Sequence, residues 1–204
     1  MRARLSWMLV AVGLLALVKG AWIPAKAVLA QALLERAWQE TMKGSTTARP
    51  WPWADTTTLA RLRAPASGAS ALVLEGGSSA VLAFGPGHVA GTPLPGNVGN
   101  SVVGGHRDTH FAFLEGVHKH DKLIVDKSDG TQQLYRVTDM AVVDEHSTWV
   151  MAPTTATTLT LVTCWPFHAL VPGGPQRYVV RAVAVADVAN DAVEGGDIDG
   201  PIRG

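Results

Sequence analysis

The chain of 204 residues is long enough for one domain with a hydrophobic core and an appendage, but short for two full domains. Hydrophobic residues make up 47% of it and charged residues 17%, which predicts a folded globular protein. The 17 basic residues balance 17 acidic ones, so the composition excludes a broad positive surface, and we expect no nucleic-acid partner.

The N-terminus has the pattern of an exported protein. Arg2 and Arg4 precede an uncharged, mostly apolar stretch at residues 5–18, and Lys19 follows it. Basic residues before an apolar run keep the start of a chain in the cytoplasm and send the rest across the membrane. We therefore expect the body of the protein on the extracytoplasmic side of the cell membrane.

Two interpretations of this segment stay open. Residues 5–18 have the length of a signal-peptide core, and residues 25–27 loosely fit a small-x-small cleavage site. Alternatively, residues 5–23 span the bilayer while the Lys19 side chain reaches toward the interface. A buried helix of a soluble domain fits the basic start less well. We predict a retained signal anchor at residues 1–24, which makes the chain a single-pass membrane protein.

A helical and extended linker is expected at residues 25–69. Apolar residues recur at helical spacing over residues 22–43, and Gly44 is the expected stop. The sequence Arg-Pro-Trp-Pro-Trp at residues 49–53 predicts an extended segment, because proline restricts both itself and the residue before it. We expect the two tryptophans of this segment to pack against the body.

From Ser70 onward, alternation and short apolar runs are typical of strands. A Ser-Asp-Gly turn is expected at residues 128–130 and a short helix at residues 109–116. No helix alternates with the strands, which favours an antiparallel barrel or sandwich over a doubly wound parallel sheet. We place this domain at residues 70–187 and a flexible tail at residues 188–204. The strands are expected at residues 71–75, 80–84, 100–104, 123–126, 134–143, 157–163 and 178–185.

Cys164 is the only cysteine, so an intramolecular disulfide is impossible. An odd cysteine in an exported protein indicates a reactive thiol or an intermolecular bond, and an inert buried cysteine is the alternative. Cys164 ends a β-prone run, a place where reactive groups become accessible. A thiol nucleophile needs a base, usually histidine, and composition does not choose among the seven histidines.

Three segments resemble the sortase family. Thr-Leu-Val-Thr-Cys at residues 160–164 matches the TLxTC signature of sortases. Residues 99–109 resemble the segment that carries the sortase catalytic histidine, here His106, and residues 176–180 resemble the strand that carries its arginine, here Arg177. The Ile-Pro-Ala-Lys-Ala and Trp-Pro-Trp segments near the N-terminus are similar to the proteobacterial branch of the family.

This resemblance implies a mainly β fold, a closed barrel of about eight strands with short helices. It also implies a cysteine transpeptidase that cleaves the C-terminal sorting signal of a target protein and transfers the new carboxyl end to an amine acceptor. Cys164 would attack the carbonyl, His106 would act as acid and then base, and Arg177 would stabilise the oxyanion. Acyl transfer of this kind needs no cofactor, and a thiolate zinc site would need more than one cysteine.

Six further residues near these motifs are assigned roles from the sequence. We assign Thr163 and Asp108 to substrate binding, although Asp108 also suits a residue that orients His106 or forms a turn. Arg107 is expected to be a solvated loop charge. Arg181 is the one rival to Arg177. His110 and His168 lie near the motifs, where a polar role without catalysis is expected.

Two other classes of protein remain as alternatives. One is an exported cysteine hydrolase or a peptidoglycan transpeptidase of another fold. Peptidoglycan L,D-transpeptidases usually carry their histidine and cysteine close together in one short motif. His106 and Cys164 lie far apart in this sequence, which argues against that class. The other is a non-catalytic, membrane-anchored binding module on a sortase fold. The absence of the motif histidine, cysteine or arginine would have favoured this alternative, but all three residues are present.

Overall fold

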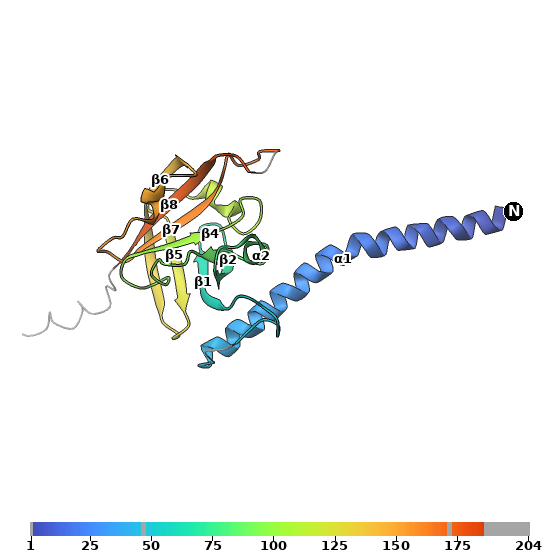
Figure 1. Cartoon of the computed structure of the whole chain (residues 1–204), viewed down its shortest axis with the longest axis horizontal. Helices are drawn as coiled ribbons and strands as arrows, with labels where there is room; N and C mark the ends of the chain where they lie inside the picture. The colour runs from blue at the N-terminus through green and yellow to red at the C-terminus, as the bar shows by residue number, and fades with distance from the viewer. Residues whose placement is uncertain (1, 46–47, 171–172, 186–204) are drawn as a thin grey trace, which may run out of the picture.

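The barrel of this protein closes through eight strands. A computed structural model describes residues 2–45, 48–170 and 173–185, so the tail expected at residues 188–204 lies outside the described residues. The strands follow the order β1-β2-β3-β4-β7-β8-β6-β5 around the barrel (Figure 1). Their bounds are β1 Thr58–Ala64, β2 Ala69–Glu75, β3 Gly87–His88, β4 Asn100–Gly104, β5 Lys122–Lys127, β6 Gln132–Asp144, β7 Thr158–Trp165 and β8 Gln176–Ala184.

Four helical segments accompany the strands. They are the long helix α1 (Arg2–Met42), the single turn α2 (Ser79–Leu82), and the 3-10 helices η1 (Ala112–Gly116) and η2 (Thr148–Met151). The mainly β, closed-barrel architecture expected from the sequence is confirmed. The short helix expected at residues 109–116 is confirmed in its second half, as η1.

Most neighbouring strands are antiparallel, but two pairs are parallel. Strand β2 pairs with β3, and β4 pairs with β7, in parallel register. The antiparallel pairing expected from the sequence is therefore wrong at these two places. The second pair matters most, because parallel strands bring their carboxyl ends to one edge. Strands β4 and β7 end there just before His106 and just after Cys164.

Strand β1 lies in the segment expected to be a linker. The barrel thus begins at Thr58 and not near residue 70. Ala60, Leu62 and Ala64 point into the core and alternate with two half-buried arginines. Two of the three core side chains are alanines, which have low β propensity, so the strand signal was weak. Pairing with β2 on one side and β5 on the other stabilises this strand.

A helical turn replaces the strand expected at residues 80–84. Ser78 caps α2, and its hydroxyl accepts a hydrogen bond from the Val81 amide at 3.3 Å. A short apolar run fits a buried helix turn as well as a strand, so periodicity could not separate the two. Serine is a preferred N-cap residue, and here the cap determined the outcome. The other six expected strands correspond to observed strands.

Helix α1 confirms the helix expected at residues 22–43. It ends at Met42, and Gly44 follows with φ of 94°, a left-handed conformation that glycine adopts at helix ends. Its C-terminal part packs on the barrel through Leu34 and Trp38, while its N-terminal part extends away from the barrel (Figure 1). Within the described ranges, no helix combines the length and the apolar character needed to cross a membrane.

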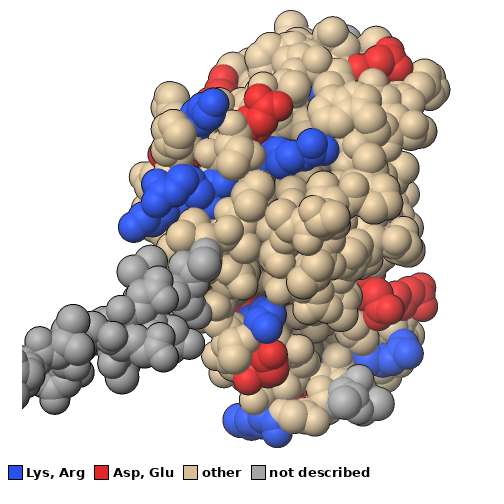
Figure 2. Space-filling view, turned by 90° about the vertical axis from the view of Figure 1, so that its left-hand side faces the viewer, with Lys and Arg blue, Asp and Glu red and all other residues tan. Residues whose placement is uncertain are grey.

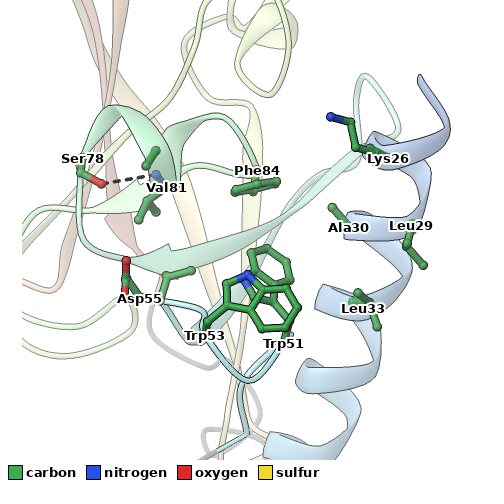
Figure 3. A pocket seen from close by; sticks show the side chains of 12 residues that line it. Lys26, Leu29, Ala30, Leu33, Trp51, Trp53, Asp55, Ser78, Val81 and Phe84 are labelled. Atoms are coloured by element: carbon green, nitrogen blue, oxygen red, sulfur yellow. Dashed lines mark hydrogen bonds between the residues drawn. The ribbon is translucent and has the colours of Figure 1, made fainter. Parts of the chain in front are cut away.

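The Trp-Pro-Trp segment borders a hollow between α1 and the barrel. Trp51 packs edge-on against Phe84 with ring centroids 5.0 Å apart, whereas Trp53 is 78% exposed. The expectation that both tryptophans pack against the body therefore holds for Trp51 alone. Figure 3 shows the hollow, of about 560 Å³, between these rings, α1 and α2. Its lining includes none of the residues Cys164, His106 and Arg177.

Charges of both signs are mixed on the face of the barrel seen in Figure 2. Basic and acidic groups lie beside each other there, with wide uncharged areas between them. Charged side chains of the protein also form pairs between elements. Arg63 of β1 lies 2.6 Å from the Asp126 carboxylate of β5, and Arg61 donates to both oxygens of Glu35 on α1 at 2.7 Å.

Candidate active site

The parallel pair β4–β7 places His106 beside Cys164. At the end of this pair the Gly105 amide donates to the Val162 carbonyl at 3.0 Å. The Thr163 hydroxyl donates in turn to the Gly105 carbonyl at 2.8 Å. His106 and Cys164 are the next residues on their two segments. They therefore emerge next to each other at the same rim of the barrel.

The antiparallel pair β7–β8 places Arg177 on the other side of Cys164. The two residues are direct partners in the register of this pair. Directly opposed residues of antiparallel strands carry their Cβ atoms about 4.5–5.5 Å apart on the same face. Cys164 itself is a free, half-buried thiol. The three residues that the sortase resemblance singles out are thus brought together from three strands or strand ends.

Packing around Gly105 fixes the backbone that carries His106. A Cβ atom at Gly105 would lie 2.7 Å from a ring carbon of Phe111, so glycine is needed for this close approach. Phe111 is fully buried, and its amide donates to the His106 carbonyl at 3.0 Å. The imidazole of His106 is exposed, which leaves it accessible to a bound substrate.

Arg177 is held in place by acceptors near the rim. Its Nη2 atom donates to Glu145 Oε2 at 2.6 Å, and Nη1 donates to the Gly174 carbonyl at 2.6 Å and to the Gln176 carbonyl at 2.9 Å. No sequence pattern indicated the Glu145 contact, since Glu145 lies 32 positions away in the chain. A guanidinium with several donors in a fixed fork can keep some contacts while it donates to a substrate oxygen.

Arg181 has different surroundings. Its partner in the register is Thr160, toward the middle of β7, and its guanidinium lies over the Trp149 ring at 5.2 Å from the centroid. This cation–π contact directs the charge to η2 rather than to the thiol. The geometry therefore favours Arg177 over Arg181 as the arginine of the site.

The Asp108 carboxylate forms an ion pair with the neighbouring Arg107 guanidinium. Both carboxylate oxygens accept hydrogen bonds from this guanidinium, Oδ1 at 2.8 Å and Oδ2 at 3.0 Å. These bonds lower the pKa of Asp108, and the positive charges of Arg107, His106 and His168 act in the same direction. Arg107 is only 5% exposed, so the expectation of a solvated loop charge is wrong.

Thr163 is buried, with 2% of its surface exposed. Because its hydroxyl is committed to the Gly105 carbonyl, the side chain holds two strands together at the rim. This burial supports a positioning role for Thr163 better than the substrate contact expected from the sequence.

The two neighbouring histidines have separate environments. Burial lowers the pKa of His110, and the charge of His106 acts in the same direction, while a hydrogen bond with the Ala83 backbone opposes them. A lowered pKa keeps His110 neutral at pH 7. His168 is exposed, and its Nε2 atom lies 2.9 Å from Glu115 Oε1.

An aromatic cluster lies in the two segments that carry Cys164 and Arg177, and sequence reasoning missed it. Trp165 stacks on Tyr178 with centroids 5.6 Å apart, and the ring of Phe167 meets both edge-on at 5.6 and 5.3 Å. Burial raises the pKa of Tyr178. The signal was available, because Trp165 directly follows Cys164 and Tyr178 directly follows Arg177. Because side chains alternate between the two faces of a strand, Trp165 and Tyr178 face away from Cys164 and Arg177, and Phe167 and Tyr178 pack against the core of the barrel.

No group of three or more potential metal ligands gathers anywhere in the part of the chain that the structure describes.

Comparison with known proteins agrees with this geometry. The family model described as the sortase domain matches residues 62–185. Sortase D of Bacillus subtilis is 31% identical over 120 residues, which cover 58% of this chain and 60% of that protein. The chain thus aligns with less than two thirds of that relative's length.

Solved structures show the same fold. Sortase A from Corynebacterium diphtheriae, in a lid mutant, has a TM-score of 0.59 and 26% identity, covering 80% of this chain and 98% of that one. Sortase C-1 from Actinomyces oris has a TM-score of 0.55 and 30% identity, covering 62% and 71%. A Clostridium perfringens sortase D5 transpeptidase, at 24% identity and a TM-score of 0.57, covers 63% and 79% and supports the fold alone.

Proposed function

Because the chain belongs to the sortase family, we propose that it is a cysteine transpeptidase acting on proteins with a C-terminal sorting signal. The observation that carries the proposal is the convergence of three segments on one rim. The β4–β7 pair sets His106 beside Cys164, and the β7–β8 register sets Arg177 opposite it. A nucleophile, an acid–base group and an oxyanion donor are the parts that acyl transfer requires.

The first half-reaction forms a thioacyl enzyme. The Cys164 thiolate attacks the peptide carbonyl carbon, so a C–S bond forms and the carbonyl π electrons move to oxygen. Arg177 donates to this oxyanion, whose charge is greatest near the transition state. As the oxyanion collapses, the C–N bond breaks and the imidazolium of His106 gives its proton to the leaving amine.

The second half-reaction transfers the acyl group to an amine. The neutral His106 imidazole takes a proton from the incoming amine while its nitrogen attacks the thioester carbon. The C–S bond then breaks, a C–N bond replaces it, and the thiolate returns.

The test begins with the substrate. A neighbouring coding sequence for a secreted protein that ends in a short motif, an apolar segment and basic residues would supply a candidate peptide. We expect the wild-type protein to cleave this peptide and to show a mass increase from the thioacyl intermediate. The variant Cys164→Ala should show neither, with an unchanged circular dichroism spectrum. A folded Cys164→Ala protein that still cleaves the peptide would rule out the proposal.

The products separate a transpeptidase from a hydrolase. With a glycine peptide present as a model amine, a transpeptidase forms a new amide that mass spectrometry detects. Release of only the free carboxylate under these conditions would favour the alternative of an exported cysteine hydrolase.

We further propose that residues 1–24 anchor the protein in the inner membrane, with the barrel on the periplasmic side. The basic start and the apolar run support this, as does the continuity of α1 from the N-terminus to the barrel. The Ile-Pro-Ala-Lys-Ala segment at residues 23–27 and the Trp-Pro-Trp segment at residues 51–53 support assignment to the proteobacterial branch. Full-length protein should stay with membranes in salt and carbonate. A mature protein beginning near Val28 would show instead that the segment is a cleaved signal peptide.

A further inference from the structure

Arg107 is a buried arginine whose hydrogen bonds join two loops. Besides the two bonds to Asp108, its Nη1 atom donates to the Pro166 carbonyl at 2.7 Å and its Nη2 atom donates to the Ala169 carbonyl at 3.2 Å. With 5% of its surface exposed, the guanidinium has little contact with water. Burial of a charge is costly unless partners replace water, and here the partners are one carboxylate and two carbonyls.

The positions of these partners are informative. Arg107 directly follows His106, and Pro166 lies two residues after Cys164. On the other side of the site, the Thr163 hydroxyl binds the Gly105 carbonyl. One cross-link therefore lies just before His106 and Cys164 on their two segments, and the other lies just after them.

The second cross-link is needed because the sheet does not extend that far. The backbone ladder between the two segments ends at the bond from the Gly105 amide to the Val162 carbonyl. Beyond this bond, the segments after His106 and Cys164 have no regular pairing in common. The Arg107 side chain connects the two segments here, through its hydrogen bonds to the carbonyls of Pro166 and Ala169.

The arrangement also keeps the cation charged and correctly oriented. The hydrogen bonds with Asp108 raise the pKa of Arg107, and the negative charge of a Cys164 thiolate adds to this effect. Asp108 binds the fork in bidentate fashion, which fixes the plane of the guanidinium. Because Arg107 is buried, direct contact with a substrate is excluded for most of its surface.

We propose that Arg107 is a positioning residue, which holds the segment after Cys164 against the segment after His106 so that thiol and imidazole keep their spacing. Asp108 is the group that orients it. This inference rests on the proposed acyl-transfer function for its kinetic consequence, but the spacing itself can be tested without a substrate. A small displacement of reacting groups is expected to reduce the rate of chemistry much more than substrate binding.

The kinetic test uses Arg107→Lys, with the exposed β6 residue Arg136→Lys as the matched control. A lysine keeps the charge but cannot reach two carbonyls and a carboxylate from one planar fork. We expect kcat on the sorting-signal peptide to fall at least about tenfold, with KM within about twofold. Arg136→Lys should leave both constants within about twofold. A folded Arg107→Lys protein with wild-type kcat would overturn the proposal.

The substrate-free test is alkylation of Cys164 by iodoacetamide, in which the thiolate sulfur bonds carbon and iodide leaves. Because loss of the spacing separates the thiol from the imidazole beside it, Arg107→Lys and Arg107→Gln should each slow alkylation at pH 7 at least about threefold, and Arg136→Lys should stay within about twofold of the wild type. Wild-type alkylation rates in both folded Arg107 variants would overturn the proposal. Circular dichroism melting checks that each variant is folded.

The two tests together separate the possible outcomes. If no peptide is cleaved by wild-type protein, the proposed function fails, while slower alkylation of Arg107→Gln still supports the contact between Arg107 and the Cys164 segment. If an Arg107 variant does not fold, Asp108→Asn replaces it, since it loosens the guanidinium without removing it. A several-fold loss of kcat in Asp108→Asn supports the proposal, and wild-type kcat overturns it.

Discussion

Two arginines on β8 lie four positions apart but have different partners. Strand geometry puts Arg177 and Arg181 on the same face, with Cα atoms roughly 13 Å apart at the usual rise per residue. Only one of them can therefore donate to an oxyanion formed at Cys164. Arg177 is the register partner of Cys164, and Arg181 is the partner of Thr160. The charge of Arg181 is also engaged with the Trp149 ring.

We predict that Arg177→Lys lowers kcat/KM by at least about tenfold, a loss of roughly 1.4 kcal/mol in transition-state stabilisation. An ammonium lacks the fork that can hold Glu145 and donate to the oxyanion at once. Arg181→Lys should stay within a few-fold of the wild type. Both variants are compared on one peptide under identical conditions. If Arg181→Lys is the impaired enzyme and Arg177→Lys is not, the arginine role passes to Arg181.

The residues of the site divide into those with a sequence signal and those without one. His106, Cys164 and Arg177 stand in recognisable motifs, and the fold brings them together. The burial of Arg107 had no such signal, because a charged residue in a loop after a histidine is ordinarily solvated. Its partners Pro166 and Ala169 lie 59 and 62 positions away, and such contacts depend on the parallel β4–β7 pair.

At the scale of elements, the hairpin β5–β6 shows how a local signal determines structure. The turn expected at residues 128–130 is confirmed, with Gly130 at φ of 83°. Asp129 Oδ1 accepts from the Thr131 amide at 2.9 Å and from its hydroxyl at 2.6 Å. Lys127 lies 3.2 Å from the other carboxylate oxygen. These contacts, led by the Thr131 hydroxyl, lower the pKa of Asp129 to about 2.

This lowered pKa predicts a pH-dependent contribution to stability. In the unfolded chain an aspartate has a pKa of about 4, so the folded state binds the proton less readily. The contribution of Asp129 is therefore fully present above about pH 4 and is lost as the pH falls toward about 2. In urea unfolding, the wild type should exceed Asp129→Asn in stability at pH 7, and this difference should shrink between pH 4 and pH 2. A difference that stays constant down to pH 2 would contradict the prediction.

The elements that were predicted wrongly are those whose local sequence patterns indicate a strand or a helix only weakly. Strand β1 relies on partners on both sides and on alanines that carry little strand preference. The apolar run at residues 80–84 could form either structure, and the Ser78 cap selected a helical turn. Parallel pairing of β2 with β3 and of β4 with β7 is a property of the chain path, which short-range patterns do not contain.

At the scale of the whole molecule, β2 joins two hydrophobic clusters. Val73 points into the barrel, where it packs with Leu123 and Tyr135 among others. Leu72 and Leu74 point outward and are covered by Leu34 and Trp38 of α1. Strand β2 is thus buried on both faces, and α1 is part of the folded domain in its C-terminal portion. The pair Arg61–Glu35 lies at the edge of this contact.

The last prediction concerns this attachment of α1. Trp38 is 3% exposed, so Trp38→Ala removes a large buried side chain and uncovers the outer face of β2. Truncations of this kind cost about 3–5 kcal/mol where the surroundings cannot collapse into the space. We expect a loss of that size in the free energy of unfolding, measured by circular dichroism in urea.

Trp53→Ala is the matched control, because Trp53 is 78% exposed and sits on the neighbouring turn. Its effect should be within about 0.5 kcal/mol, as for most surface substitutions. Equal stability of the two variants would mean that α1 can leave the barrel without cost. A selective loss in Trp38→Ala would mean that the packing of α1 on the outer face of β2 stabilises the barrel whose rim carries Cys164.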